Sequence, residues 1–354
     1  MSLPIPASVR ANPLRAATLA CSCWAFGVLI ATGLGLAFGA SRGWHGVVAS
    51  VDLLPAGACA AASFLFRFLR WHLLARRVAP ALGLRASFAM GTIGFALTMT
   101  PGRAGEALKL LLLRQRTAVP IATSAPVLFL EKVSEGIGFA LLALAASFFL
   151  PWSEALRTGA DIAVIAPIIA LALAAGFRRR ITALAPGLPL VGRLLARPGL
   201  QKLWSDLAHG GDRVLGWTGL LLALGLSLLA RAFDGLVIFW VAGMYGLDLP
   251  PAAAWFIIGS AGFVGGVSML PGGAGAVEAT MVGLLLAFGG EPAAAAATAL
   301  TSRILILWLW VLLGLGLALR YSTRAGGWGL GAGRGSTPIH FSAPNPQPPT
   351  PNPR

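Results

Sequence analysis

Two acidic residues, Glu131 and Glu135, lie inside a long apolar segment of the chain. Being four apart, they share one face of a helix, whereas Lys132 is expected to point elsewhere. Glu131 falls about ten residues into its segment, near the midplane of a bilayer at 1.5 Å per residue. A charge at that depth costs at least ~2.5 kcal/mol, so it should face the interior of a helix bundle and have a partner there.

Arg303 lies at a matching depth in a later apolar segment, and we expect it to pair with Glu131. Two interpretations remain open for this pair: a structural ion pair that locks two halves together, or a site for a proton or a lipid head group. Arg231 and Asp234 are three apart, so they are expected to neutralise one another on one helix face.

Two Pro-Gly turns interrupt the apolar segments. Backbone that leaves a helix at membrane depth is tolerated only where it is buried in protein or lines a wet cavity. The helix that restarts after such a turn aims free N–H groups at the cavity, which suits an anionic phosphate. The alternative is a pair of simple loops at the membrane surface. The turn residues are Pro101, Gly102 and Gly105 in the first, and Pro271, Gly272, Gly273 and Gly275 in the second.

An acidic residue follows each turn, Glu106 in one case and Glu278 in the other. Carboxylates at such positions cap the free amides of a helix start. Capping and the binding of a proton or head group are both open for these two residues.

Basic residues near the ends of the early apolar segments form a second group. Arg67, Arg70 and Trp71 either anchor a helix end at the interface or recruit an anionic lipid head group. With Arg103 and Lys109, the two arginines are the expected head-group ligands. No motif predicts a catalytic or metal site, and no cofactor is expected.

The surroundings of these residues exclude a water-soluble protein. Of 354 residues, 57% are hydrophobic and only 11% are charged, against about 25% charged in an average soluble domain. The 27 Lys and Arg outnumber the 12 Asp and Glu, which gives a formal net charge of +15. Because the basic residues lie between apolar runs, anionic lipid is a better partner for them than nucleic acid.

The apolar runs predict an all-α polytopic membrane protein. About 20 apolar residues span a core of ~30 Å, and the sequence predicts six full transmembrane helices and two shorter, split segments that form re-entrant hairpins. The predicted helices are 16–39, 47–69, 121–150, 160–177, 217–243 and 293–319, and the hairpins are 86–100 with 104–116 and 252–270 with 274–289.

Loop charges orient these elements, because Lys and Arg stay on the cytoplasmic side. A full crossing by 86–100 would strand Lys109, Arg114 and Arg116 outside, so the first hairpin is expected to enter from the cytoplasm and the second from outside. Two inverted repeats result. The predicted organisation is a cytoplasmic segment 1–15, a membrane domain 16–322 with repeats at about 47–150 and 217–319 and a cytoplasmic loop 178–213, and a disordered Gly- and Pro-rich cytoplasmic tail 323–354.

The motifs at 67–74, 100–109, 131–132 and 270–278, with Arg303, resemble the lysylphosphatidylglycerol synthase transmembrane-region family, whose members include flippase domains. The resemblance covers roughly 15–320. It implies movement of an anionic, aminoacylated or polyprenyl-phosphate lipid between leaflets. In this family, the bacterial multiple-peptide-resistance proteins carry an aminoacyl-transferase domain after the membrane region. This chain has a Pro-rich tail at that place, so we expect a stand-alone member of the family.

The expected function is therefore lipid transport in the bacterial inner membrane, with both termini cytoplasmic. The expected partner is a membrane phospholipid or a polyprenyl-phosphate lipid, without nucleic acid. Two alternatives stay open: a membrane-embedded transferase or transferase subunit acting with a separate soluble catalytic partner, and a purely structural or assembly factor. A homodimer is compatible with the sequence.

Overall fold

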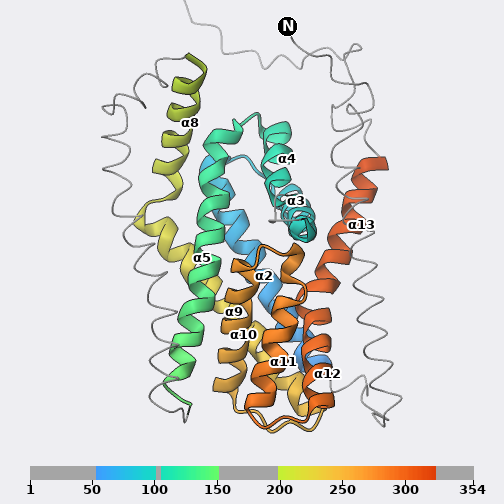
Figure 1. Ribbon diagram of the computed structural model, residues 1–354. Coiled ribbons are helices and arrows are strands. Elements are labelled where there is room, and N and C mark those ends of the chain that lie inside the picture. Colours follow the sequence, from blue (N-terminus) through green and yellow to red (C-terminus); the bar gives the residue numbers. More distant parts are fainter. Residues whose placement is uncertain (1–52, 101–104, 151–197, 324–354) are drawn as a thin grey trace, which may run out of the picture.

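The computed structural model describes residues 53–100, 105–150 and 198–323, and every regular element in these ranges is helical (Figure 1). The all-α membrane class expected from the sequence is thereby confirmed. The predicted helices 16–39 and 160–177, the segment 1–15 and the tail 323–354 fall almost wholly outside the described residues.

Three helices are long and apolar enough to cross a membrane by length and composition, among the described residues. They are α2 (Leu53–Val78), α9 (Trp217–Met244) and the continuous run Pro292–Arg320. That run comprises α12 (Pro292–Arg303), a π-helical turn (Ile304–Trp308) and α13 (Leu309–Thr323). A fourth helix, α5 (Ile121–Ser147), has the length but carries three charges near its middle.

Four shorter helices form two pairs, each broken at one of the Pro-Gly turns. The first pair is α3 (Leu84–Ala96) and α4 (Leu108–Thr117), and the second is α10 (Pro251–Val267) and α11 (Ala276–Ala287). Figure 1 shows α3 and α4 towards one end of the molecule and α10 and α11 towards the other. The second turn reaches the end of the first pair between them, because the Cα of Gly272 lies close against the side chain of Met99, which ends the helical segment Leu97–Met99 before the first turn.

The helix contacts exchange between the two halves of the chain. The long helices α2 and α9 pack on each other along their length. The first short helix of each pair packs on the last long helix of the other half: α3 on α13, and α10 on α5. A twofold axis in the membrane plane would produce this exchange, so it supports the predicted inverted repeat.

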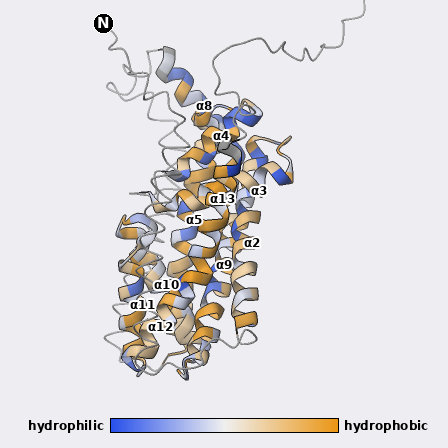
Figure 2. Cartoon of the chain, turned by 90° about the vertical axis from the view of Figure 1, so that its right-hand side faces the viewer, coloured by the Kyte–Doolittle hydropathy of each residue, from blue (hydrophilic) through white to orange (hydrophobic). Residues whose placement is uncertain are grey.

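Two apolar clusters hold the ends of the molecule together. One gathers Trp71, Leu97, Leu113 and Trp308 around the α3–α4 pair, and the other gathers residues such as Ile257 and Met281 around the α10–α11 pair. The hydropathy colouring of Figure 2 is mostly apolar along the long helices, with hydrophilic segments towards the end that carries α8. The buried charges lie between the two apolar clusters.

Within the predicted cytoplasmic loop 178–213, the described part forms helix α8 (Pro198–Val214). Leu203, Trp204 and Leu207 recur at helical spacing, which gives this segment one apolar face. Gly210 lies so close to the Thr123 carbonyl that a Cβ would sit 2.0 Å from the oxygen, so α8 packs directly on α5.

Candidate functional site

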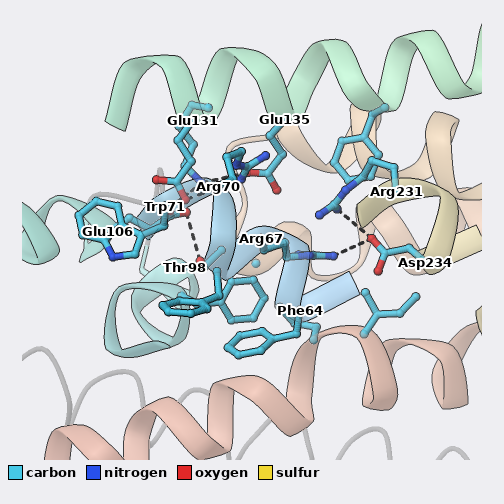
Figure 3. Close-up of a pocket in the computed structure, with 18 of the residues that line it drawn as sticks. Phe64, Arg67, Arg70, Trp71, Thr98, Glu106, Glu131, Glu135, Arg231 and Asp234 are labelled. Atoms are coloured by element: carbon cyan, nitrogen blue, oxygen red, sulfur yellow. Dashed lines mark hydrogen bonds and ion pairs between the residues drawn. The ribbon is translucent and has the colours of Figure 1, made fainter. Parts of the chain in front are cut away.

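A polar cavity lies where the two Pro-Gly turns approach α2, α5 and α9 (Figure 3). Its volume is about 80 Å³. Its wall combines aromatic rings with most of the charges found at membrane depth. The charged lining residues are Arg67, Arg70, Glu106, Lys109, Glu131, Lys132, Glu135, Arg231, Asp234 and Arg303.

Asp234 is the centre of the first charge cluster and is 0% exposed. One carboxylate oxygen accepts a hydrogen bond from the Ser63 hydroxyl at 2.5 Å. The other oxygen lies 2.6 Å from Arg67 Nη2 and 3.0 Å from Arg231 Nη1. The expected Arg231–Asp234 contact therefore exists, and Arg67 from the other half of the chain joins it (Figure 3).

Glu131 is the centre of the second cluster. Its carboxylate pairs with the Lys109 ammonium of α4 and lies 3.7 Å from Arg70 Nη2. Arg70 is also 3.7 Å from Glu135, so the two carboxylates on one face of α5 share one guanidinium, as their spacing indicates. Lys109 is further covered by Trp71, with its Nζ 4.6 Å from the ring centroid. The predicted pairing of Glu131 with Arg303 is wrong.

Lys132 links the hairpin to α5, contrary to the expectation that it points away. Its Nζ lies 2.5 Å from Glu106 and 3.2 Å from Glu135. Glu106 also accepts a hydrogen bond from the Thr98 hydroxyl at 3.1 Å. The described contacts of Glu106 thus belong to the cavity wall, and no side-chain cap precedes α4.

Arg303 belongs to the other hairpin. Its Nε lies 2.7 Å from Glu278, and its Nη2 donates to the Gly272 carbonyl at 2.7 Å. Glu278 also accepts a hydrogen bond from the Gly275 backbone N–H at 2.7 Å. It therefore caps α11, and capping is one of the two interpretations that the sequence left open for this residue. In each half of the chain, a charged residue on the second short helix pairs with the helix that follows. The short helix carries the basic partner in the first half, Lys109, and the acidic partner in the second half, Glu278.

The turn residues are only partly described. Pro101, Gly102 and Arg103 lie outside the described residues. Gly105 donates its N–H to the Thr100 hydroxyl at 2.6 Å. In the second turn Gly272, Gly273 and Gly275 all have positive φ, a conformation that glycine adopts without steric cost.

The cavity carries an excess of positive charge. Counting Glu278, six cations face five carboxylates across the clusters, which leaves one positive unit. Arg231 is 2% exposed, and its Nε and Nη2 have no hydrogen-bond partner among the described residues; the same holds for Nε of Arg70. Buried guanidinium N–H groups without partners are costly, and an anionic ligand in the cavity would satisfy them.

Two serines that were not predicted from the sequence, Ser63 and Ser227, hydrogen-bond to charged residues of the cavity. Ser63, Arg67 and Arg70 occupy the same three positions of α2 that Ser227, Arg231 and Asp234 occupy in α9, counted from the first residue of each helix. Each serine contacts a charged residue from the other half of the chain.

Ser63 donates to Asp234, and Ser227 accepts from Arg70 at 2.5 Å. This repeated spacing was readable in the sequence, and it would have placed both serines in the site.

Comparisons with known proteins match the part of the chain that carries these residues. The family described as "Lysylphosphatidylglycerol synthase TM region" matches residues 24–314, which is most of the chain. The chain belongs to this family. A relative named "UPF0104 membrane protein", from Methanothermobacter thermautotrophicus, is 28% identical over 253 residues, covering 67% of this chain and 73% of the relative. No solved structure matches the chain. The family assignment makes this a membrane protein, and all four resembling motifs fall within the matched residues.

Proposed function

We propose that this protein moves an anionic lipid, such as a phospholipid or a polyprenyl phosphate, between the leaflets of the inner membrane. The observation that carries the proposal is the buried guanidinium of Arg231, whose Nε and Nη2 have no hydrogen-bond partner among the described residues, in a cavity with excess positive charge. The membership in a family of membrane domains is compatible with it.

The arrangement of the cavity supports translocation in preference to a purely structural role. A head group crossing hydrocarbon must replace its hydration with protein groups, because an unpaired charge there is expensive. The cavity offers guanidinium donors at the level where the two hairpin turns meet. Hairpins from opposite ends meeting at one site are typical of transporters that expose the site alternately.

The described contacts also suggest how the charges respond to a ligand. Arg67 and Lys109 are each within 3 Å of a carboxylate and are already neutralised. Arg70 is held more loosely, at 3.7 Å from both of its carboxylates. Arg231 pairs with Asp234 through Nη1 at 3.0 Å, but its Nε and Nη2 have no hydrogen-bond partner among the described residues, and neither has Nε of Arg70. We therefore assign the phosphate to Arg231 and Arg70, with Arg67 and Lys109 holding the carboxylates in place.

The test is lipid exchange in proteoliposomes that contain the full chain and a tail-labelled phosphatidylglycerol. Membrane-impermeant dithionite bleaches the outer leaflet, and transport exposes the inner-leaflet label as well. The change Arg231→Gln removes a charge-assisted contact worth about 1.5–3 kcal/mol, so exchange should slow about tenfold or more.

Arg77→Gln is the matched control, because Arg77 is outside the cavity and contacts Thr218 at an exposed position. It should exchange lipid at the parent rate. A folded, monodisperse Arg231→Gln variant with the parent rate would contradict the assignment of the site. A parent protein inactive with both phosphatidylglycerol and a polyprenyl phosphate would contradict the function.

A further inference from the structure

Helices α5 and α10 touch at one end of their contact and separate towards the other. A Cβ at Gly259 of α10 would lie 2.8 Å from the Ala143 backbone, and one at Gly262 would lie 2.1 Å from the Phe139 ring. At Gly266, one turn further, no described atom lies within 4 Å of the same position. The helices are therefore in close contact at Gly259 and Gly262, and the space beside α10 is open at Gly266, near the C-terminal end of the helix.

This gap is a groove with a volume of about 500 Å³. Its outer wall is apolar and exposed: Val267 is 66% and Met269 64% exposed. Gly136 of α5 leaves the opposite wall free of side chain. The remaining uncharged lining residues are Ala107, Leu128, Phe139, Gly262, Phe263 and Gly266.

The groove continues into the charged cavity. Glu106, Lys132 and Glu135 line both, and among the described residues no other charged side chain lines the groove. Phe139 and Gly262 are shared as well. Lys132, with 31% of its side chain exposed, lies between the two carboxylates at this junction. One continuous space thus has an apolar arm, a polar junction and an interior rich in guanidinium groups.

We propose that the groove between α5 and α10 holds the hydrocarbon tail of the same anionic lipid whose head group enters the cavity. This rests on the proposed function and adds the route: the lipid loads sideways, and its tail remains in apolar surroundings. A free phosphate or other soluble anion satisfies the arginines but leaves the apolar arm empty. An anionic lipid satisfies both parts of the space.

The groove wall suits a flexible chain. Glycines on both faces leave a smooth channel, and the unbranched Met269 at its rim adapts to irregular apolar partners. Met269 has φ of +54°, a left-handed conformation that is uncommon outside glycine. A hydrocarbon chain in this position removes exposed apolar surface of both lipid and protein from any water that enters the cavity.

The test closes the groove without disturbing the fold. Gly266→Phe and Gly136→Leu each add a side chain that faces the groove, at positions where a Cβ meets no described atom within 4 Å. Excluding only about two methylene groups of tail corresponds to about a tenfold loss, so dithionite-detected exchange of tail-labelled phosphatidylglycerol should fall at least that far. Gly283→Phe on α11 is the matched control, since it too is free of neighbours within 4 Å but does not line the groove.

A second measurement separates this inference from the transport proposal. A phosphatidylglycerol with a photoactivatable diazirine in its tail should crosslink to residues 128–139 and 262–269 of the parent. Crosslinking should be lost in Gly266→Phe and retained in Gly283→Phe. Glycerol phosphate, which has no tail, should raise the melting temperature of the parent and of Gly266→Phe equally.

Each outcome decides one question. A parent that crosslinks in the groove but exchanges no lipid would overturn transport and keep the tail site. A parent that exchanges lipid, with Gly266→Phe and Gly136→Leu exchanging it equally fast, would overturn the groove. Crosslinks found only outside α5 and α10 would overturn it as well.

Discussion

Asp234 holds the most demanding position among the charged residues. It is fully buried and receives two guanidinium groups and one hydroxyl, from α2 and from its own helix. Burying charges is favourable only when each one is paired and hydrogen-bonded. Asp234 is therefore the group that allows Arg67 and Arg231 to remain charged side by side, and so keeps Arg231 available for a ligand.

Asp234→Asn should destabilise the protein strongly. It removes the counter-charge and leaves two buried arginines facing each other, and loss of one partner of a buried pair costs about 3–5 kcal/mol. The apparent melting temperature in detergent, followed by size exclusion after heating, should drop well below that of the parent. Ser63→Ala is the milder comparison, because it removes one hydrogen bond worth about 1 kcal/mol. Equal melting of Asp234→Asn and the parent would disprove the role of Asp234.

At this scale the sequence predicted which charges are buried but mispaired them. Depth along the apolar runs singled out Glu131 and Arg303, which are both buried, because a charge among apolar residues is visible in the sequence. Depth says nothing of lateral position in the bundle. Lys109 and Glu278 lie on the short helices. Lys109 pairs with Glu131 and Glu278 pairs with Arg303, so Glu131 and Arg303 do not pair with each other. The ion pair of Lys132 with Glu106 was not predicted, because helix spacing alone cannot show that the hairpin approaches Lys132.

Among the elements, the two hairpin turns determine the geometry of the cavity. Gly272 lies with φ of +60° against Met99, and Arg303 donates to its carbonyl. This contact fixes the level at which the two halves meet. The apolar lengths and Pro-Gly dipeptides predicted the short helices, because a run of fewer than about 17 residues cannot span the core. Helix α8 was missed because its polar residues resemble those of a loop.

Alanine substitutions at three glycines should separate conformation from crowding. Gly275→Ala meets no described atom within 4 Å but has φ of +83°, so it should lose about 1 kcal/mol through backbone strain. Gly272→Ala adds a clash, with its Cβ 2.1 Å from Met99 Cε, and should be the least stable. Gly283→Ala, in an open helical position, should be neutral or gain up to about 1 kcal/mol. The order of melting temperatures checks this, and Gly272→Ala melting above Gly275→Ala would contradict the contact between the turns.

Across the whole molecule, charge divides between the two ends. The end that carries α4 and the C-termini of α2 and α13 is basic, whereas the opposite end carries acidic loop residues (Figure 1). The basic residues at the first end include Arg76, Arg77, Arg114, Arg116, Arg213 and Arg320, which outnumber the two aspartates of α8, Asp206 and Asp212. The acidic loop residues at the opposite end are Asp248 and Glu291. The positive-inside rule predicts that the basic end is cytoplasmic. We then expect the α3–α4 hairpin to open to the cytoplasm and the α10–α11 hairpin to the outside.

Cysteine labelling tests this orientation. In a background where Cys21, Cys23 and Cys59 are replaced by alanine, a single cysteine is placed at Arg114 or at Glu291. A membrane-impermeant maleimide should label Glu291→Cys in intact spheroplasts, and Arg114→Cys only after permeabilisation. The physical reason is that α4 returns to the side from which α3 started, which keeps Arg114 and Arg116 with the other cytoplasmic cations. Labelling of Arg114→Cys from outside would mean that 84–117 crosses the bilayer completely. The meeting of two opposed hairpins at one cavity, and with it alternating access to the head group, would then be untenable.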